Sequence, residues 1–309
     1  MKCVVTGATG FVGRHLCKQL LARGDEVVAL SRSGASLADG TPTRAVDLAT
    51  AAVPTALLEN ADTVFHLAGI AHRRAHADDY DQVNHRATQE LAARSAAAGA
   101  ACFVYLSSVR AMGTATDARR RSESDSCVPD EPYGLSKWRA ERALYDSCAA
   151  HRMSVAVVRP GLVYGAGVKG NLHSLARAVR HGLPRLPAGG RRSLIAVEDL
   201  VELLCCIADA PSPGAHTWIA TAEDYSAQQL VDALRAALGK PIDTRPVPRW
   251  LWRVAALAHD VVRRHPGPGT YDTLFGSELY DNAAVLAATS WRPRGSFARS
   301  AGDLLRASA

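Results

Sequence analysis

The stretch "VVTGATGFVG", residues 4–13, decides the fold. It places Gly7, Gly10 and Gly13 where a run of apolar β-formers gives way to a helical pattern. In such a strand-to-helix turn, the first glycine permits the tight turn and the second lets backbone N–H groups approach a diphosphate, while the third allows close packing of helix on strand. Because a strand precedes the turn and a helix follows it, the stretch predicts a dinucleotide-binding site.

The chain beyond this turn alternates short β-rich runs with longer helical patterns. Strands are expected at residues 2–6, 26–32, 43–48, 62–69, 102–108 and 154–160, and helices at residues 11–24, 79–98 and 133–150. Strands separated by helices of this length form right-handed crossovers and a parallel sheet with helices on both faces. We therefore predict an α/β fold with a doubly wound parallel sheet of the Rossmann type.

The character of the sequence changes after residue 165. Loops rich in Gly, Pro and Arg join helices that we expect at residues 198–209, 226–238, 249–264 and 297–306. We predict a nucleotide-binding domain at residues 1–165, to which elements from about 194–220 return, and a smaller, mixed C-terminal substrate lobe at residues 166–309.

Composition limits the classes of protein to consider. The 309 residues carry a net charge of +6 at pH 7, which suits an anionic ligand, and no nucleic-acid-binding module is recognisable. The seven cysteines have no metal-ligand spacing, which predicts reduced thiols and no metal site. The sequence shows neither a signal segment nor an apolar run of about 18 residues, so we expect a cytoplasmic protein without a membrane span.

Two further stretches allow more than one reading. "WLWRVAALAHDVV", residues 250–262, is expected to be a core-facing helix of the second lobe, with contact to a membrane surface as the alternative. His72 and His76, around Arg73 and Arg74, have the spacing of a metal pair, but no third ligand is evident. We therefore favour solvated residues or phosphate contacts there.

The stretch "EPYGLSKWRAE", residues 131–141, carries the candidate acid–base chemistry. Tyr133 and Lys137 are four residues apart and share one helix face. A tyrosine with a pKa near 10 is a poor proton-transfer group at pH 7, but a lysine one turn away favours the phenolate. A unit charge at 4 Å contributes up to roughly 4 kcal/mol at an effective dielectric of about 20. Gly134 costs about 1 kcal/mol inside a helix, and we expect its missing side chain to leave room for cofactor or substrate.

The motifs taken in order resemble the short-chain dehydrogenase/reductase superfamily, and in particular its extended branch, which acts largely on nucleotide-activated sugars. The glycine turn is followed by "HLAG" (66–69), "VN" (83–84), "YLSS" (105–108), the Tyr133/Lys137 pair and "RPGLVYG" (159–165). The resemblance implies that Tyr133 exchanges a proton with the substrate oxygen and that Ser108 holds the same oxygen, while Ser107 faces the fold. Lys137 is expected to bind the nicotinamide ribose as well as to tune Tyr133.

The resemblance also implies a cofactor site. The residues expected to form it are Gly7, Thr9, Gly10, Phe11, Val12, Arg32, Asp47, Leu48, Leu67, Ala68, Gly69, Tyr133, Lys137 and Pro160. Asp47 is expected to hold the adenine amino group. The second strand ends in Arg32 without the carboxylate that usually binds the ribose 2′-OH of NAD, and a guanidinium can grip a 2′-phosphate. We therefore favour NADP(H) and leave NAD(H) open.

The substrate is expected from the C-terminal segments. "GVKGNLHSLARAVRHGLP" (167–184) and "RRSLIAVEDLVELL" (191–204) resemble enzymes that assemble surface polysaccharides such as O-antigen from UDP-linked N-acetylhexosamines. By that resemblance Asn171 and Leu172 lie along the diphosphate and uracil, and Arg192 contacts the phosphate or uridine. The resemblance further implies a homodimer through the helices at residues 79–98 and 133–150.

These features lead to three hypotheses about function, given below in order of preference. Related dehydratases carry Asp-Glu directly after the catalytic hydroxyl, where this chain has Val109 and Arg110, so a dehydratase is disfavoured. The leading hypothesis is an NADP(H)-dependent reductase of the C4 ketone of a UDP-linked 4-keto-6-deoxy-N-acetylhexosamine. The second is an NAD-dependent 4-epimerase of a UDP- or lipid-diphosphate-linked N-acetylhexosamine. A non-catalytic NADP-sensing scaffold is the alternative from another class.

Overall fold

One large parallel sheet organises the computed structural model, which describes residues 1–307 apart from residues 72–74, 115–118, 126, 151, 243–244, 246 and 264–268. Its strand order is β3-β2-β1-β4-β5-β7-β10, and every neighbouring pair is parallel. The strands are β1 (Lys2–Thr6), β2 (Glu26–Ser31), β3 (Arg44–Ala45), β4 (Thr63–His66), β5 (Cys102–Leu106), β7 (Ser154–Pro160) and β10 (Ala215–Ala220).

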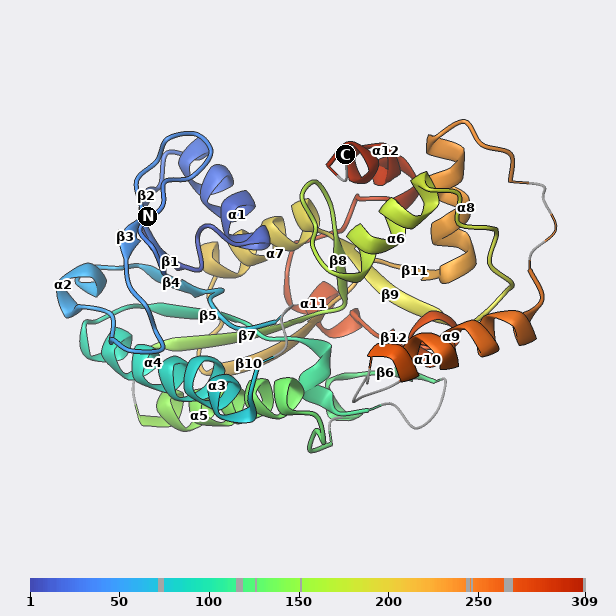
Figure 1. The fold of residues 1–309 in the computed structure, drawn as a ribbon. Helices are drawn as coiled ribbons and strands as arrows, with labels where there is room; N and C mark the ends of the chain where they lie inside the picture. The colour runs from blue at the N-terminus through green and yellow to red at the C-terminus, as the bar shows by residue number, and fades with distance from the viewer. Residues whose placement is uncertain are drawn as a thin grey trace.

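Helices cover both faces of this sheet (Figure 1). One layer contains α1 (Phe11–Ala22) and α7 (Val197–Asp209), and the other contains α2 (Thr55–Leu58), α4 (Ala87–Ala97) and α5 (Pro132–Ala150). The alternation along β1 shows how the sequence builds the two layers: Cys3 and Val5 pack against the first and Val4 against the second, and all three are fully buried. The predicted doubly wound α/β fold is confirmed.

A smaller lobe stands beside the large sheet. Its sheet has the order β11-β9-β8, in which β9 is parallel to β8 and antiparallel to β11. An apolar core formed with three helices includes Leu172, Leu230 and Phe297. The elements of this sheet and its helices are β8 (Leu162–Tyr164), β9 (Arg191–Ala196), β11 (Glu223–Ser226), α6 (Asn171–Arg180), α8 (Ala227–Ala237) and α12 (Phe297–Ala307).

Further elements complete the lobe. β6 (Arg120–Arg121) pairs with β12 (Leu279–Tyr280), and two more helices are α9 (Arg249–Arg263) and α10 (Thr270–Phe275). α11 (Ala283–Ala288) packs instead against the core of the large sheet through Val285. α7 and β10 interrupt the lobe in sequence and return to the large sheet. The boundary between two domains at residue 165 stays a prediction.

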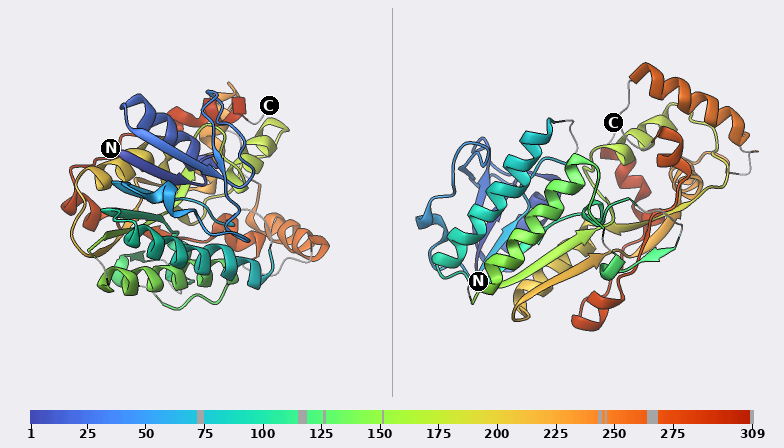
Figure 2. Two further views of the ribbon diagram at one scale, coloured as in Figure 1. Left: turned by 90° about the vertical axis from the view of Figure 1, so that its left-hand side faces the viewer. Right: turned by 90° about the horizontal axis from the view of Figure 1, so that it is seen from below.

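The topology of the large sheet decides where a ligand can bind. The strand order reverses between β1 and β4, and in open α/β sheets ligands bind beyond the carboxyl ends of the strands at such a switch point. The smaller lobe lies at that end of the sheet in each view (Figures 1 and 2). We therefore expect the ligand-binding site to lie between the glycine turn and the smaller lobe.

Two elements of the structure differ in length from those expected from the sequence. The strand expected at residues 43–48 shortens to β3, because only Leu30 and Ser31 of β2 pair with it. The helix expected at residues 79–98 begins earlier, as α3 (Ala77–Tyr80), and passes through a π-helical turn, Asp81–Arg86, before α4. π-Helical turns are frequent at functional sites, and this one contains the buried Asn84.

The core-facing interpretation of residues 250–262 holds for one side of α9 only. Trp252 packs against the lobe core and Ala256 is buried, whereas Trp250, Leu251, Val254 and Leu257 are all exposed. Within the described residues, no helix is both long and apolar enough to span a bilayer.

Candidate active site

The glycine turn joins β1 to α1 at the switch point of the sheet. Gly7 adopts a φ of +69°, and a Cβ on it would lie 2.8 Å from the Ala68 backbone nitrogen after β4. A Cβ on Gly13 would lie 2.2 Å from the Gly7 carbonyl oxygen, so α1 packs directly on the turn. The helix start at Gly10 has no side-chain cap. Its N–H groups and helix dipole are therefore suited to a diphosphate, and the cradle fits a dinucleotide.

The other expected cofactor residues follow the same edge of the sheet. Arg32 comes directly after β2 and is exposed, and Asp47 follows β3, where its carboxylate accepts a hydrogen bond from the Ala49 N–H. Pro160 ends β7 and is buried. The first turn of α1 and the segment after β4 contribute the remaining members, which are Thr9, Phe11, Val12, Leu67, Ala68 and Gly69, with Leu48 beside Asp47. Their contacts with a cofactor stay a prediction.

Asn84 in the π-helical turn clamps the segment after β4. Its side-chain oxygen accepts a hydrogen bond from the Ile70 N–H at 2.7 Å, and its amide donates to the Ile70 carbonyl and the Ser136 hydroxyl, each at 3.0 Å. A Cβ on Gly69 would lie 2.9 Å from the Asn84 side-chain oxygen and 3.4 Å from Lys137 Nζ. The glycine therefore lets the chain pass directly beside the candidate catalytic lysine.

A buried histidine ties β1 to β4. Thr6 Oγ1 and His66 Nδ1 are hydrogen-bonded at 2.7 Å, and His66 Nε2 lies 2.8 Å from Thr88 Oγ1. The Thr88 hydroxyl donates to the Asn84 carbonyl, so it accepts from His66 Nε2–H. Nδ1 is then the acceptor of the Thr6 hydroxyl proton. Burial, with a smaller effect of the Lys137 charge, lowers the pKa of His66 to about 3.

The structure brings Tyr133 and Ser108 together. Tyr133 is the second residue of α5, and Ser108 follows β5 as the N-cap of the 3₁₀ helix Val109–Met112. The Ser108 hydroxyl accepts a hydrogen bond from the Arg110 N–H at 3.2 Å. Burial raises the pKa of Tyr133 to about 12, although the neighbouring Ser108 hydroxyl acts in the opposite direction. Burial therefore holds Tyr133 as the neutral phenol.

Lys137 lies one turn along α5 but interacts elsewhere. Its Nζ donates to the Leu106 carbonyl at 2.9 Å and lies 4.6 Å from the centre of the Tyr105 ring. Burial lowers the pKa of Lys137 to about 8, and Glu141 opposes that shift. The expected depression of the pKa of Tyr133 by Lys137 is absent from this structure, because burial dominates and the ammonium is directed toward the end of β5.

A buried ion pair supports the strand that carries Ser108. Glu141 and Arg159 are joined by two contacts, Nη2 to Oε2 at 2.6 Å and Nε to Oε1 at 3.0 Å. The Ser107 hydroxyl donates to Glu141 Oε1 at 2.5 Å, so Ser107 faces the fold as expected. Sequence reasoning missed this carboxylate. The available signal was its place one turn after Lys137, on the same helix face.

The expected substrate residues lie in the smaller lobe. Asn171 is the exposed first residue of α6, whereas the Leu172 side chain belongs to the lobe core, so only the Leu172 backbone is available to a ligand. In β9, the Nη1 atom of Arg192 lies 3.7 Å from Glu278 Oε2, and the buried Nε atom of Arg192 has no hydrogen-bond partner. Arg110 Nη1 lies 3.4 Å from Glu278 Oε1. Two guanidinium groups thus flank one carboxylate, and sequence reasoning missed Arg110 in this role because its partners lie in distant segments.

The remaining candidates are the residues around His72 and His76. Residues 72–74, which include His72, Arg73 and Arg74, lie outside the described residues, and His76 caps the start of α3. Within the described part of the chain, no group of three His, Cys, Asp or Glu residues is arranged to hold a metal ion.

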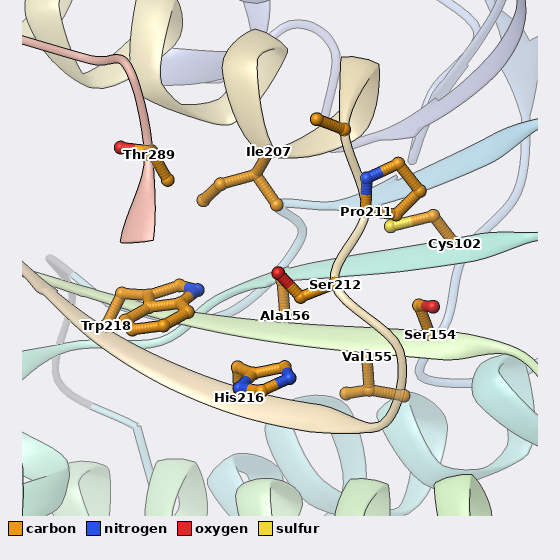
Figure 3. Close-up of a pocket in the computed structure, with 11 residues that line it drawn as sticks. Cys102, Ser154, Val155, Ala156, Ile207, Pro211, Ser212, His216, Trp218 and Thr289 are labelled. Atoms are coloured by element: carbon orange, nitrogen blue, oxygen red, sulfur yellow. The ribbon is translucent and has the colours of Figure 1, made fainter. Parts of the chain in front are cut away.

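A small recess lies at the opposite end of the large sheet (Figure 3). It is formed where β5 and β7 begin, and Cys102, Ser154 and the stacked pair of His216 and Trp218 contribute to its lining. Because it contains none of the expected site residues, it is separate from the candidate active site.

Comparisons with known proteins agree with this geometry. The model of the NAD dependent epimerase/dehydratase family matches residues 3–220. UDP-glucose 4-epimerase of Vibrio cholerae is 33% identical over 309 residues, covering 94% of this chain and 90% of that protein. dTDP-6-deoxy-L-talose 4-dehydrogenase (NAD(P)(+)) of Kitasatospora kifunensis is 34% identical over 267 residues, covering 80% of this chain and 82% of that protein.

A solved structure matches over almost the full chain. MoeE5 in complex with UDP-glucose and NAD has a TM-score of 0.78 and 26% identity, covering 99% of this chain and 98% of that one. The resemblance inferred from the ordered motifs is confirmed. The chain belongs to the NAD dependent epimerase/dehydratase family.

Proposed function

We propose that the protein is an NAD-dependent 4-epimerase of a UDP- or lipid-diphosphate-linked hexose or N-acetylhexosamine. The observation that carries the proposal is the placement of the Ser108 hydroxyl, after β5, next to the Tyr133 phenol at the start of α5. Two hydroxyl groups in this arrangement can both hydrogen-bond to one substrate oxygen. Val109 and Arg110 follow Ser108 without a carboxylate for eliminating water, so the site suits reversible oxidation at one carbon.

Each residue of the site has a distinct task in this reaction. When bound, a nicotinamide supplies the hydride acceptor and donor, and the helix start after Gly10 is suited to its diphosphate. Tyr133 takes the proton of the C4 hydroxyl during oxidation and returns it to the ketone oxygen during reduction. Ser108 holds that oxygen in both halves. The neutral phenol of Tyr133 is the form that donates the proton, and Lys137, one turn along α5, is assigned to the nicotinamide ribose.

The sugar diphosphate is assigned to the smaller lobe. Arg192 retains an unpaired buried Nε, which is a free donor for an anion, and Asn171 presents the exposed start of α6. Arg110 lies on the same carboxylate as Arg192. A diphosphate that binds Arg192 would therefore lie close to the segment that carries Ser108.

A second candidate is the NADP(H)-dependent C4 ketone reductase. Arg32 at the end of β2 favours it, because a guanidinium there suits the 2′-phosphate of NADP. We place the epimerase first, because the similarity to UDP-glucose 4-epimerase extends over 94% of the chain.

Cofactor retention and turnover distinguish the two candidates. Nucleotide released from the denatured purified protein is identified by mass spectrometry, and UDP-N-acetylglucosamine and UDP-glucose are incubated with the enzyme without reductant. The epimerase retains NAD and interconverts the C4 epimers, whereas the reductase requires NADPH and a 4-keto sugar. Tyr133→Phe is expected to lower turnover by about 10²–10⁴-fold and to leave nucleotide retention unchanged. Wild-type protein that transforms neither class of substrate would refute both candidates.

The assembly and location are also proposals. A shallow groove on the outer face of α4 and α5 is lined by residues that include Gln89, Trp138 and Arg142, and we assign this face to the homodimer. Trp138→Glu is expected to shift the mass measured by light scattering toward that of the monomer. Location in the cytoplasm stays a prediction.

A further inference from the structure

Helix α9 carries apolar side chains on two sides. Toward the lobe, Trp252 packs against the lobe core, Ala256 is 5% exposed, and the Arg249 guanidinium donates to the Ala188 carbonyl. On the outer side, Trp250, Val254 and Leu257 recur at helical spacing and are 65%, 58% and 59% exposed. One apolar face of the helix is therefore packed on the protein, and a second is presented to the outside.

The exposed apolar face of α9 lies at the edge of the lobe and has arginines around it. α9 lies at the periphery of the lobe in both views of Figure 2. Arg249 and Arg253 are exposed on the helix and Arg245 is exposed before it, and the chain as a whole carries a net charge of +6. Ile242, just before the helix, adds a further exposed apolar side chain. A tryptophan and aliphatic residues flanked by arginines are the composition of helices that lie in the interface of an anionic membrane.

We propose that α9 docks the protein onto the surface of an anionic lipid bilayer. The side chains of Trp250, Val254 and Leu257 enter the boundary between headgroups and acyl chains, and the flanking arginines contact lipid phosphates. The helix lies in the plane of the interface, because none of the described helices can span a bilayer.

A second copy of the chain fits this face less well. A two-fold interface places the same patch of both copies together, so Arg245 and Arg253 of one copy would lie against the same cations of the other. A stable dimer also buries about 800 Å² on each partner, with roughly 20–30 residues a side. The five exposed apolar residues here, Ile242, Trp250, Leu251, Val254 and Leu257, form a much smaller patch.

The docking face is structurally connected to the candidate substrate site. Arg253 of α9 lies 6.0 Å from the centre of the Tyr271 ring in α10, and the Arg192 guanidinium donates to the Asp272 carbonyl of α10 at 3.4 Å. A docked α9 would therefore hold the Arg192 end of the site near the membrane. This step rests on the proposed function, since it favours a sugar diphosphate whose lipid remains in the bilayer.

The test uses the full chain and sedimentation with vesicles. Wild-type protein is expected to bind phosphatidylglycerol vesicles more tightly than phosphatidylcholine vesicles, with affinity falling as salt increases. Val254→Ser/Leu257→Ser is expected to weaken binding by about tenfold or more. Arg253→Gln should weaken binding to the anionic vesicles alone. The matched control is Val128→Ser, which removes an equally exposed apolar side chain (62%) outside α9 and should bind like the wild type.

The outcomes separate this proposal from the others. Equal sedimentation of the wild type and the α9 double variant overturns docking through α9. Absence of vesicle binding, with a dimer in light scattering that the double variant dissociates, also overturns it and assigns the face to a second copy. Turnover of the soluble UDP-sugar should be the same in the double variant and the wild type. If the wild type does not turn over the soluble UDP-sugar, the proposed function is contradicted, whereas the docking result is unaffected.

Discussion

Gly134→Ala tests whether α5 and the Ser108 segment are in as close contact as the structure shows. A Cβ on Gly134 would lie 2.5 Å from the Arg110 carbonyl oxygen and 3.1 Å from Pro129 Cβ. The Arg110 contact is with backbone, so a side-chain rotation cannot relieve it. The structure thus corrects the expectation that Gly134 makes room for cofactor or substrate, because what occupies the space is the protein itself.

The magnitude follows from two opposing effects. Helix propensity favours alanine over glycine by up to about 1 kcal/mol, whereas forcing an extra carbon into a packed site costs typically about 1–3 kcal/mol. The net expectation is a loss of about 1 kcal/mol of unfolding free energy. Arg110 N–H binds Ser108 Oγ, so the displaced backbone carries the catalytic hydroxyl with it. A misplacement approaching 1 Å can cost about 10²-fold in rate, so kcat is expected to fall by roughly 10–100-fold.

Thermal unfolding and steady-state kinetics measure the two effects, and Gly302→Ala in α12 is the matched control. A Cβ on Gly302 would have only Arg306 Nη1 within reach, at 3.8 Å, so this variant is expected to gain about 0.5–1 kcal/mol. If Gly134→Ala stabilises the protein as much as Gly302→Ala and kcat is unchanged, the close contact has been misassigned.

Three further predictions concern buried charge and cofactor choice. Glu141→Gln should lower the unfolding free energy by about 3–5 kcal/mol in denaturant titration, because it removes the carboxylate charge that pairs with the buried Arg159 guanidinium; a loss below about 1 kcal/mol would contradict this. The pKa of His66 is lowered to about 3 from its ordinary 6.5, so stability present above pH 6.5 should be lost as pH falls toward 3. Tm measured between pH 7 and 5 should fall more steeply in the wild type than in His66→Gln, and parallel curves would exclude His66 as the cause. Arg32→Ala should lower affinity for NADP(H) and leave that for NAD(H) unchanged in fluorescence titration, whereas equal loss of both would exclude a contact with the 2′-phosphate.

The parts of the site that the sequence predicted are those with local patterns. The glycine turn lies within ten residues, and the spacing of Tyr133 and Lys137 is set by one helical turn. The alternation of strands and helices likewise determined the parallel sheet. Ser108 was predicted from the resemblance of "YLSS" (105–108) to the family motif, and it follows β5 in the structure.

What escaped prediction depends on pairings between distant segments. Thr6 meets His66 only through the register of β1 against β4, and Arg110 shares Glu278 with Arg192 only after the lobe has folded. The apolar periodicity of α9 predicted the side that packs on the lobe through Trp252 and Ala256. It did not predict the second, exposed apolar side, because how much of a helix is covered depends on how distant segments pack around it.

The 3₁₀ helix Val109–Met112 connects these observations, because it joins both lobes at the reacting end of the site. Its N-cap is Ser108, and Arg110 extends from it to Glu278 in the smaller lobe. The buried Arg121 donates to the carbonyls of Met112 and Gly113 and so fixes the other end of the segment. A ligand anion that draws Arg110 from Glu278 would therefore act on the backbone that positions the catalytic hydroxyl. Arg110→Lys, which keeps the charge but not the planar fork, should consequently lower kcat as well as raise KM, whereas a residue that only binds substrate would raise KM alone.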